Sequence, residues 1–278
     1  MEEQSVYETD KLRQTLASEG KLVELGKTYD GSFPDLPSMN NGKKWDFRAI
    51  NAPRMIGDKL DPHSRTRIAA IAKLVDPTKK TLDFGVGPGD ILAYLKKIHH
   101  NIDYTGIDIS QKFIDRLTKL FPENTFICQD IADIESGSYQ QVLALEVLEH
   151  VEVPSIKKIY QNIWRILSDD GNLIISVPVY EKLEEITMCC SKCSNLENVA
   201  GHVRAYTPEL LKAEVELAGF RVVDCRYVYS PATNLVKNIL KDVLRPIRKD
   251  RPVTAIIKAM KIKTSGQYGL PEYKQNGS

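Results

Sequence analysis

Between residues 81 and 229 the chain alternates short β-rich runs with segments of helical period, and this alternation constrains its fold more than any other feature. The pattern is typical of βαβ units around a parallel sheet. The expected strands are TLDFG (from Thr81), YTGID (from Tyr104), TFICQD (from Thr125), QVLALEV (from Gln141), NLIISVP (from Asn172) and RVVDCRYVY (from Arg221). The expected helices cover residues 91–98, 112–120, 155–167 and 208–218, the last with Thr207 as N-cap. We therefore expect an α/β fold with a doubly wound, mostly parallel sheet.

Two flanking segments differ from this central domain, which we place at residues 61–230. Residues 1–60 combine short amphipathic stretches with the Pro-, Gly- and Asn-rich piece GSFPDLPSMNNGKKW, which predicts an N-terminal helical cap followed by a loop. Residues 231–278 predict a basic C-terminal helical extension. No partner strand for the sheet is evident after Tyr229, because Val253 to Ile262 fits a helix equally well.

Charge is concentrated in the C-terminal extension. Residues 237–263 hold nine basic residues against Asp242 and Asp250, a balance of +7 in a chain whose net charge is +1. Lys237, Lys241 and Arg245 form a ridge beside apolar residues at helical spacing. Such a helix could lie on an anionic membrane, contact RNA phosphates, or pack its apolar face on the main domain.

The composition indicates in which cellular compartment the protein resides. No apolar run approaches the roughly 18 residues of a membrane-spanning helix, and the acidic start MEEQSVYETDKLRQTL does not resemble a signal peptide. The five cysteines indicate reduced thiols. The sequence thus predicts a cytoplasmic protein, with peripheral membrane contact through the basic extension as an addition. Its near-zero net charge disfavours broad nucleic-acid binding.

A glycine-rich loop follows the first expected strand, where ligands bind in such sheets. Its sequence, Asp83-Phe84-Gly85-Val86-Gly87-Pro88-Gly89-Asp90, has an acid where a dinucleotide fingerprint needs a small residue. This argues against a pyrophosphate ligand. Asp108 ends the second strand, within reach of ribose hydroxyls, and Asp130 ends the third, where a carboxylate could accept from an adenine amino group. The pattern favours a nucleoside without phosphates.

Six motifs in order resemble class I S-adenosylmethionine-dependent methyltransferases: LDFGVGPGD, TGIDIS, FICQDI, LALEVLEHV, ILSDDGNLIISVP and GHVRAYTPELLKAEVELAGF. The resemblance implies a Rossmann-like methyltransferase fold and S-adenosylmethionine as cofactor. It places Gly85, Gly87 and Gly89 near the methionine part, Asp108 on the ribose, and Asp130 with Ile131 beside the adenine. Arg65 or Arg67 would hold the cofactor carboxylate. Asp83, Ile109 and Glu146 complete the cofactor-binding residues that the resemblance implies.

The run E-x-x-E-H after the fourth strand predicts a metal site. On a helical turn, Glu146, Glu149 and His150 share one face, and two carboxylates with an imidazole suit a divalent ion. His202 could add a fourth ligand. Ubiquinone-pathway O-methyltransferases and small-RNA 3′-end 2′-O-methyltransferases are similar here, with Glu, Glu, His and His around a divalent ion such as Mg²⁺. The alternative interpretation is a methyltransferase helix start with Glu146 near the cofactor, Glu149 solvated and His150 in a structural hydrogen bond.

These residues predict transfer of a methyl group to the hydroxyl of a small or lipid-linked acceptor such as a phenol, quinone precursor or sugar. A cation lowers the pKa of the hydroxyl, or His150 or His202 accepts the proton alone, with Glu149 as a further catalytic candidate. The alternatives are an RNA or N-methyltransferase and a non-catalytic nucleoside-binding or partner-binding module. Cys190-x-x-Cys193 could form a zinc site with Cys189 and His202, which would remove His202 from the other metal site. Free thiols are the preferred interpretation, because tetrahedral zinc usually shows two such pairs.

Overall fold

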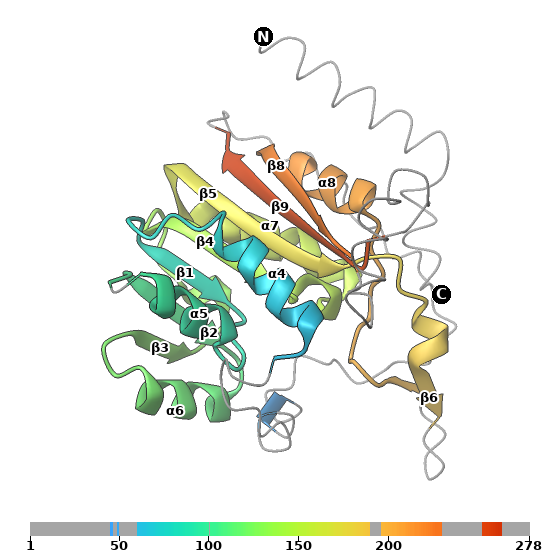
Figure 1. The fold of residues 1–278 in the computed structure, drawn as a ribbon. Helices are drawn as coiled ribbons and strands as arrows, with labels where there is room; N and C mark the ends of the chain where they lie inside the picture. The colour runs from blue at the N-terminus through green and yellow to red at the C-terminus, as the bar shows by residue number, and fades with distance from the viewer. Residues whose placement is uncertain are drawn as a thin grey trace, which may run out of the picture.

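The computed structural model describes residues 45, 46, 49, 60–99, 101–189, 196–229 and 252–262. Its centre is a seven-stranded sheet in the order β3-β2-β1-β4-β5-β9-β8 (Figure 1). The strands are β1 (Thr81–Phe84), β2 (Tyr104–Asp108), β3 (Thr125–Cys128), β4 (Tyr139–Leu145), β5 (Leu167–Pro178), β8 (Phe220–Val228) and β9 (Thr254–Lys261). All neighbouring pairs are parallel except those that β9 makes with β5 and β8. This confirms the doubly wound, mostly parallel fold.

Helices cover both faces of the sheet. They are α4 (Pro62–Ala72), α5 (Asp90–Ile98), α6 (Gln111–Leu120), α7 (Val153–Ile166) and α8 (Pro208–Leu217), with short 3₁₀ turns η1 (Ile131–Asp133), η2 (Leu148–His150) and η3 (Leu183–Ile186). One core lies under α4, α5 and α6 and the other under α7 and α8, as the buried residues of each helix show. Successive residues of β9 alternate between them, since Ile257 joins the second core and Ile256 the first.

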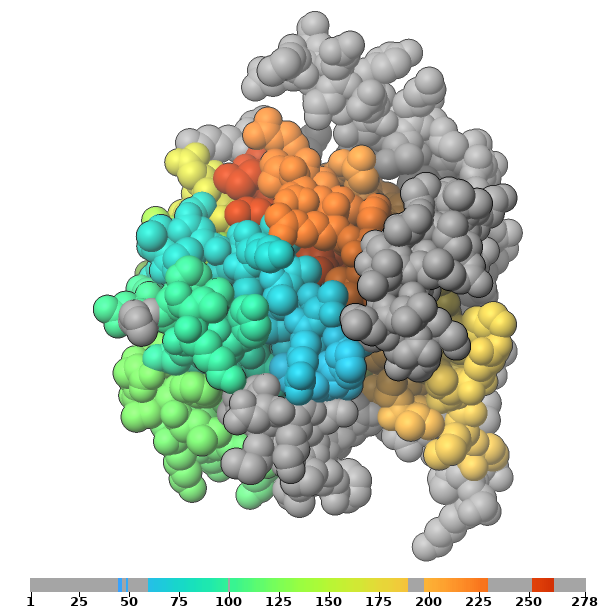
Figure 2. Space-filling view, viewed as in Figure 1, coloured from blue at the N-terminus to red at the C-terminus, as the bar shows by residue number. Residues whose placement is uncertain are grey.

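The strand β9 corrects the predicted C-terminal helix. Thr254–Lys261 pairs with Asn172–Pro178 on one side and with β8 on the other, so the domain extends past residue 230. Ala255, Ile256 and Ile257 are fully buried, and β9 shows only as small red patches in the space-filling view (Figure 2). A strand buried on both faces has no polar alternation, and this leaves a short apolar run ambiguous between strand and helix.

Two of the basic residues assigned to the charged extension also belong to this strand. Lys258 donates to the carbonyl of Leu74 at 2.8 Å, and Lys261 donates to the carbonyl of Leu167 at 2.6 Å with its ammonium 3.9 Å from the centre of the Trp164 ring. These two lysines therefore stabilise the domain. The ridge of Lys237, Lys241 and Arg245 lies outside the described residues, as do the predicted N-terminal helices, Cys190 and Cys193.

A two-stranded sheet, β6 (Thr187–Cys189) with β7 (Leu196–Asn198), lies apart from the main sheet (Figure 1). The expected N-cap of α8 is confirmed, because Thr207 accepts from the backbone of Leu210. None of the described helices is long and apolar enough to cross a bilayer.

Replacing Gly89 by alanine tests how closely the loop after β1 packs. It has φ +81°, and a Cβ there would lie 2.5 Å from Cδ2 of Leu117. Gly137 has φ +65°, but a Cβ on it would meet no atom of the described residues within 4 Å, so we expect Gly137→Ala to incur the backbone cost of about 1–2 kcal/mol. We expect Gly89→Ala to cost about 1–3 kcal/mol more from overpacking, measured by urea denaturation. Equal losses in the two variants would refute the packing role.

Candidate functional site

The glycine loop shapes the site at the carboxyl end of β1. Gly85, Gly87 and Gly89 all have positive φ. Gly85 and Gly89 pack closely, against Val147 and Leu117, whereas among the described residues a Cβ on Gly87 would meet only the carbonyl of Gly85, at 3.9 Å. Gly87 therefore borders open space, where a ligand can approach the backbone.

Asp108 ties this loop to the next strand. Its carboxylate accepts from the backbone N–H of Gly87 at 2.9 Å and of Ser110 at 2.8 Å. Burial raises its pKa from the ordinary value. Each carboxylate oxygen can accept more than one hydrogen bond, so Asp108 keeps capacity for the hydroxyls of a ribose.

The remaining predicted nucleoside residues occupy the same edge. Asp130 is exposed and caps η1 through the backbone N–H of Ala132 at 2.8 Å. Ile131 is buried and Ile109 is half-buried at the end of β2. Asp46 was not predicted, yet it accepts from the hydroxyl of Ser110 at 2.7 Å. Little in the sequence indicated Asp46, because it precedes the first strand by many residues and follows a Gly- and Asn-rich stretch.

Asp83 lies beneath the loop, not on its surface. It is 2% exposed and accepts from the hydroxyl of Tyr104. Burial raises its pKa to about 7, against the opposing effect of the Tyr104 hydrogen bond. Asp83 thus supports the loop from below.

The free energy of unfolding of the domain should fall as pH rises, because of Asp83. The folded state holds this proton up to about pH 7, whereas the unfolded chain, with the ordinary value of 3.8, releases it earlier. The contribution of Asp83 to the free energy of unfolding is complete below pH 3.8 and is lost as pH rises to about 7. Relative to Asp83→Asn, the wild type should lose up to about 1.4 kcal/mol per pH unit across this window. Urea denaturation from pH 4.5 to 7.5 measures it, and parallel curves would contradict it.

The metal prediction is corrected for Glu146. This residue has φ +56° and precedes the short turn η2, so E-x-x-E-H does not form one continuous helical face. Its carboxylate instead accepts from Arg67 at 2.6 Å and from the hydroxyl of Ser176 at 2.8 Å. Arg67 is therefore the arginine of α4 that faces the site, whereas Arg65 is exposed.

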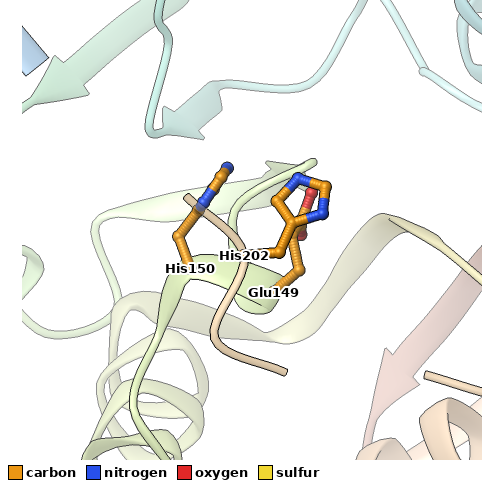
Figure 3. Close-up of side chains that lie close together, drawn as sticks. All are labelled: Glu149, His150 and His202. Atoms are coloured by element: carbon orange, nitrogen blue, oxygen red, sulfur yellow. The ribbon is translucent and has the colours of Figure 1, made fainter. Parts of the chain in front are cut away.

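Glu149, His150 and His202 come together from two segments, with ligand atoms within 4.8 Å of one another (Figure 3). The loop that carries His202 docks on η2, because the backbone N–H groups of Val203 and Arg204 donate to the carbonyl of Glu149 at 2.8 and 3.2 Å. The two imidazole rings lie 4.9 Å apart. Sequence alone could not establish this approach.

Glu149 is the most unusual member of this Glu149–His150–His202 cluster. It is 1% exposed, and neither carboxylate oxygen has a hydrogen-bond partner among the described residues. Burial, followed by the charge of Glu146, raises its pKa well above the ordinary value. A buried carboxylate is costly unless a cation or hydrogen bonds compensate it, so this position suits a bound cation or a proton.

Each imidazole has Nδ1 bound to an acceptor. Nδ1 of His150 donates to the carbonyl of Gly201 at 2.9 Å, and Nδ1 of His202 donates to the carboxylate of Glu181 at 2.7 Å. Nε2 is consequently the nitrogen that carries the lone pair on both rings. The ring of Trp45 meets that of His150 edge-on at 4.8 Å. Trp45 and Glu181 were not predicted from the sequence, although an acid three residues after a strand is a recognisable signal.

Comparisons with known proteins bear on the family and the fold. Residues 81–171 match the family described as "Methyltransferase domain". A carboxy-S-adenosyl-L-methionine synthase of Campylobacter concisus is 21% identical over 131 residues, which are 46% of this chain and 56% of that protein. The chain thus spans little more than half the length of that curated relative.

Two solved structures share the fold. One is 1,6-didemethyltoxoflavin-N1-methyltransferase of Burkholderia thailandensis with bound 1,6-didemethyltoxoflavin and S-adenosylhomocysteine, at a TM-score of 0.53 and 17% identity over 78% of this chain and 83% of that one. The other is the cyclase SpnF, at a TM-score of 0.57 and 17% identity over 84% of this chain and 99% of that one.

Proposed function

We propose that this chain, which carries a class I S-adenosylmethionine-dependent methyltransferase domain, transfers the methyl group of that cofactor to the hydroxyl oxygen of a small or lipid-linked acceptor. The observation that carries the proposal is the buried, unpartnered carboxylate of Glu149 between two imidazoles, within the part of the chain that the structure describes. Oxygen acceptors need deprotonation before transfer, and these groups can take or stabilise a proton.

The cofactor fits the residues at the carboxyl ends of β1 to β3. Gly87 leaves room for its methionine part, and Asp108 remains able to accept from its ribose. Arg67 is better placed than Arg65 to meet the cofactor carboxylate, since it already points at Glu146. Asp130 and Ile131 supply a polar and an apolar border for the adenine.

A divalent ion also fits the cluster, with Glu149, His150 and His202 as its ligands. Two imidazoles and one carboxylate suit Mn²⁺, Fe²⁺ or Zn²⁺ better than Mg²⁺, which prefers oxygen ligands. A bound ion would stabilise the deprotonated acceptor oxygen. Without it, the proton of the acceptor hydroxyl passes to Nε2 of His202 or His150, whose Nδ1 atoms stay bound to Glu181 and Gly201.

Chelation distinguishes these two routes. We expect methyl transfer, measured as S-adenosylhomocysteine formed across a panel of phenols, sugars and lipid-linked hydroxyl compounds, to stop in excess chelator and return with Mn²⁺. Cofactor affinity should persist, because the glycine loop and Asp108 lie outside the cluster. Full activity in chelator would exclude the ion and leave the histidines as bases. Turnover with RNA or amines alone would refute the acceptor class.

The named relatives supply a second candidate function. A relative named carboxy-S-adenosyl-L-methionine synthase raises the option that the cofactor itself is the substrate. Mass spectrometry of the products, with a carboxyl donor present in the assay, decides between them: methyl transfer yields S-adenosylhomocysteine, whereas a synthase would add the donor's carboxyl group and yield a heavier derivative of S-adenosylmethionine. Calorimetry without any cofactor binding would refute both candidates.

Asp108→Asn tests the ribose contact directly. The variant removes the negative charge but keeps one oxygen acceptor, and we expect roughly 10–100-fold weaker S-adenosylmethionine binding, since hydrogen bonds to charged groups contribute about 1.5–3 kcal/mol. Asp103→Asn, an exposed aspartate before the same strand, is the matched control. Calorimetry gives both affinities, and an unchanged Kd in Asp108→Asn would remove it from the cofactor site.

A further inference from the structure

The two imidazoles of the cluster are oriented by different groups. His150 is held by a neutral backbone carbonyl, that of Gly201, whereas His202 is held by the carboxylate of Glu181. A carboxylate is the stronger acceptor, and the bond it forms with an imidazole N–H fixes the tautomer and the orientation of the ring. His202 is therefore chemically distinct from His150.

The backbone around both partners fixes this contact. Tyr180, just before Glu181, has φ +59°, and within the described residues only Glu146 shares such a conformation among non-glycine residues. Tyr180 donates its N–H to the carbonyl of Tyr206 at 2.8 Å. Such a backbone conformation is unfavourable for a residue with a side chain and persists only where its surroundings enforce it. Here it directs Glu181 toward the loop of His202.

The loop of His202 is held from the other side. Oδ1 of Asn198 accepts from the backbone N–H groups of Ala200 and His202, at 2.9 and 3.2 Å. The side chains of His202 and Glu181 are 13% and 24% exposed, so the pair is only partly screened by water. Both partners are thus preorganised before any ligand binds.

We propose that Glu181 is the positioning residue of the site, fixing His202 with its hydrogen on Nδ1 and directing Nε2 toward Glu149. Building on the proposed function, this makes His202 the more firmly oriented proton acceptor or ligand of the two histidines. The acceptor hydroxyl should then lie on the His202 side of the cluster. In this role Glu181 acts through His202.

Glu181→Gln tests the proposal on the full chain, with Glu184→Gln, an exposed glutamate in the same segment, as the matched control. Loss of such a supporting carboxylate typically costs about 10–100-fold in metal affinity or activity. We expect that loss in Mn²⁺ affinity and in kcat for Glu181→Gln, with unchanged S-adenosylmethionine affinity and Tm. Glu181→Asp should recover part of kcat. Glu184→Gln should match the wild type.

A spectroscopic readout separates this inference from the proposed function. Long-range ¹H–¹⁵N spectra of the metal-free protein should show His202 with its hydrogen on Nδ1, and Glu181→Ala should convert it to a mixture of tautomers. If wild type binds no Mn²⁺ but the tautomer depends on Glu181, the metal route fails and the positioning role stands. A tautomer and kcat unaffected by Glu181→Ala would overturn the positioning role.

Discussion

Replacing His202 by alanine should lower kcat by roughly 10²–10⁴-fold, the usual contribution of a positioned acid–base group. His150→Ala should cause a similar loss, and the double variant should lose little more, since residues that act as a unit do not contribute additively. Steady-state kinetics with the identified acceptor measures all three. S-adenosylmethionine affinity should remain, because the Nδ1 atoms of the two histidines bond to Gly201 and Glu181, whereas Asp108 bonds to the backbone of Gly87 in the glycine loop.

His99→Ala is the control for this series. His99 ends α5 and its backbone N–H donates to the carbonyl of Leu95, away from the cluster, so its replacement should leave kcat unchanged. A His202→Ala variant that keeps more than about a tenth of the activity would fall outside the expected range for such a group. So would strict additivity of the two losses, which would mean independent roles for the histidines.

Glu214→Ala should be the most destabilising single change in the domain. Glu214 and Arg204 form an ion pair that is 11% and 9% exposed, and Arg204 also donates to the hydroxyl of Tyr206 at 2.5 Å. Removing one partner leaves a buried charge uncompensated, which costs about 3–5 kcal/mol. For a domain of this size that lowers Tm by roughly 6–20 °C, measured by scanning calorimetry and checked by urea denaturation.

Two variants test the cause of that loss. The double change Arg204→Met with Glu214→Leu should recover much of it, because replacing a whole buried pair by apolar residues is often neutral. Glu185→Ala removes an exposed pair with Lys182, 62% and 66% exposed, and should cost less than about 1 kcal/mol. A Glu214→Ala variant as stable as Glu185→Ala would contradict the burial argument.

The sequence predicted six of the seven main strands because each combines a short apolar run with a turn signal. It missed β9 since Ala255, Ile256 and Ile257 are buried on both faces and carry no period. For the site, spacing placed the glycine loop and Asp108 at the carboxyl ends of β1 and β2, where the structure has them. It misplaced Glu146, because nothing in E-x-x-E-H reveals the φ of +56° that turns this side chain to Arg67 and Ser176.

The approach of His202 to Glu149 depends on hydrogen bonds between segments more than fifty residues apart. Such contacts follow from the packing of the whole domain and not from local preference. The fold itself does not decide the chemistry either, since a methyltransferase and a cyclase share it with this chain at nearly equal similarity. The side chains at the carboxyl ends of the strands must decide it.

The antiparallel course of β9 has a consequence for how such a protein can diversify. Pro178, Thr254 and Val228 lie in register across three strands, and the N–H of Val253 donates to the carbonyl of Val228 at 2.8 Å. The chain after Val228 therefore leaves and returns at the same edge of the sheet as the Glu149–His150–His202 cluster. Because the entropy of closing a loop grows slowly with its length, insertions here can accumulate at this edge of the sheet while every strand keeps its register.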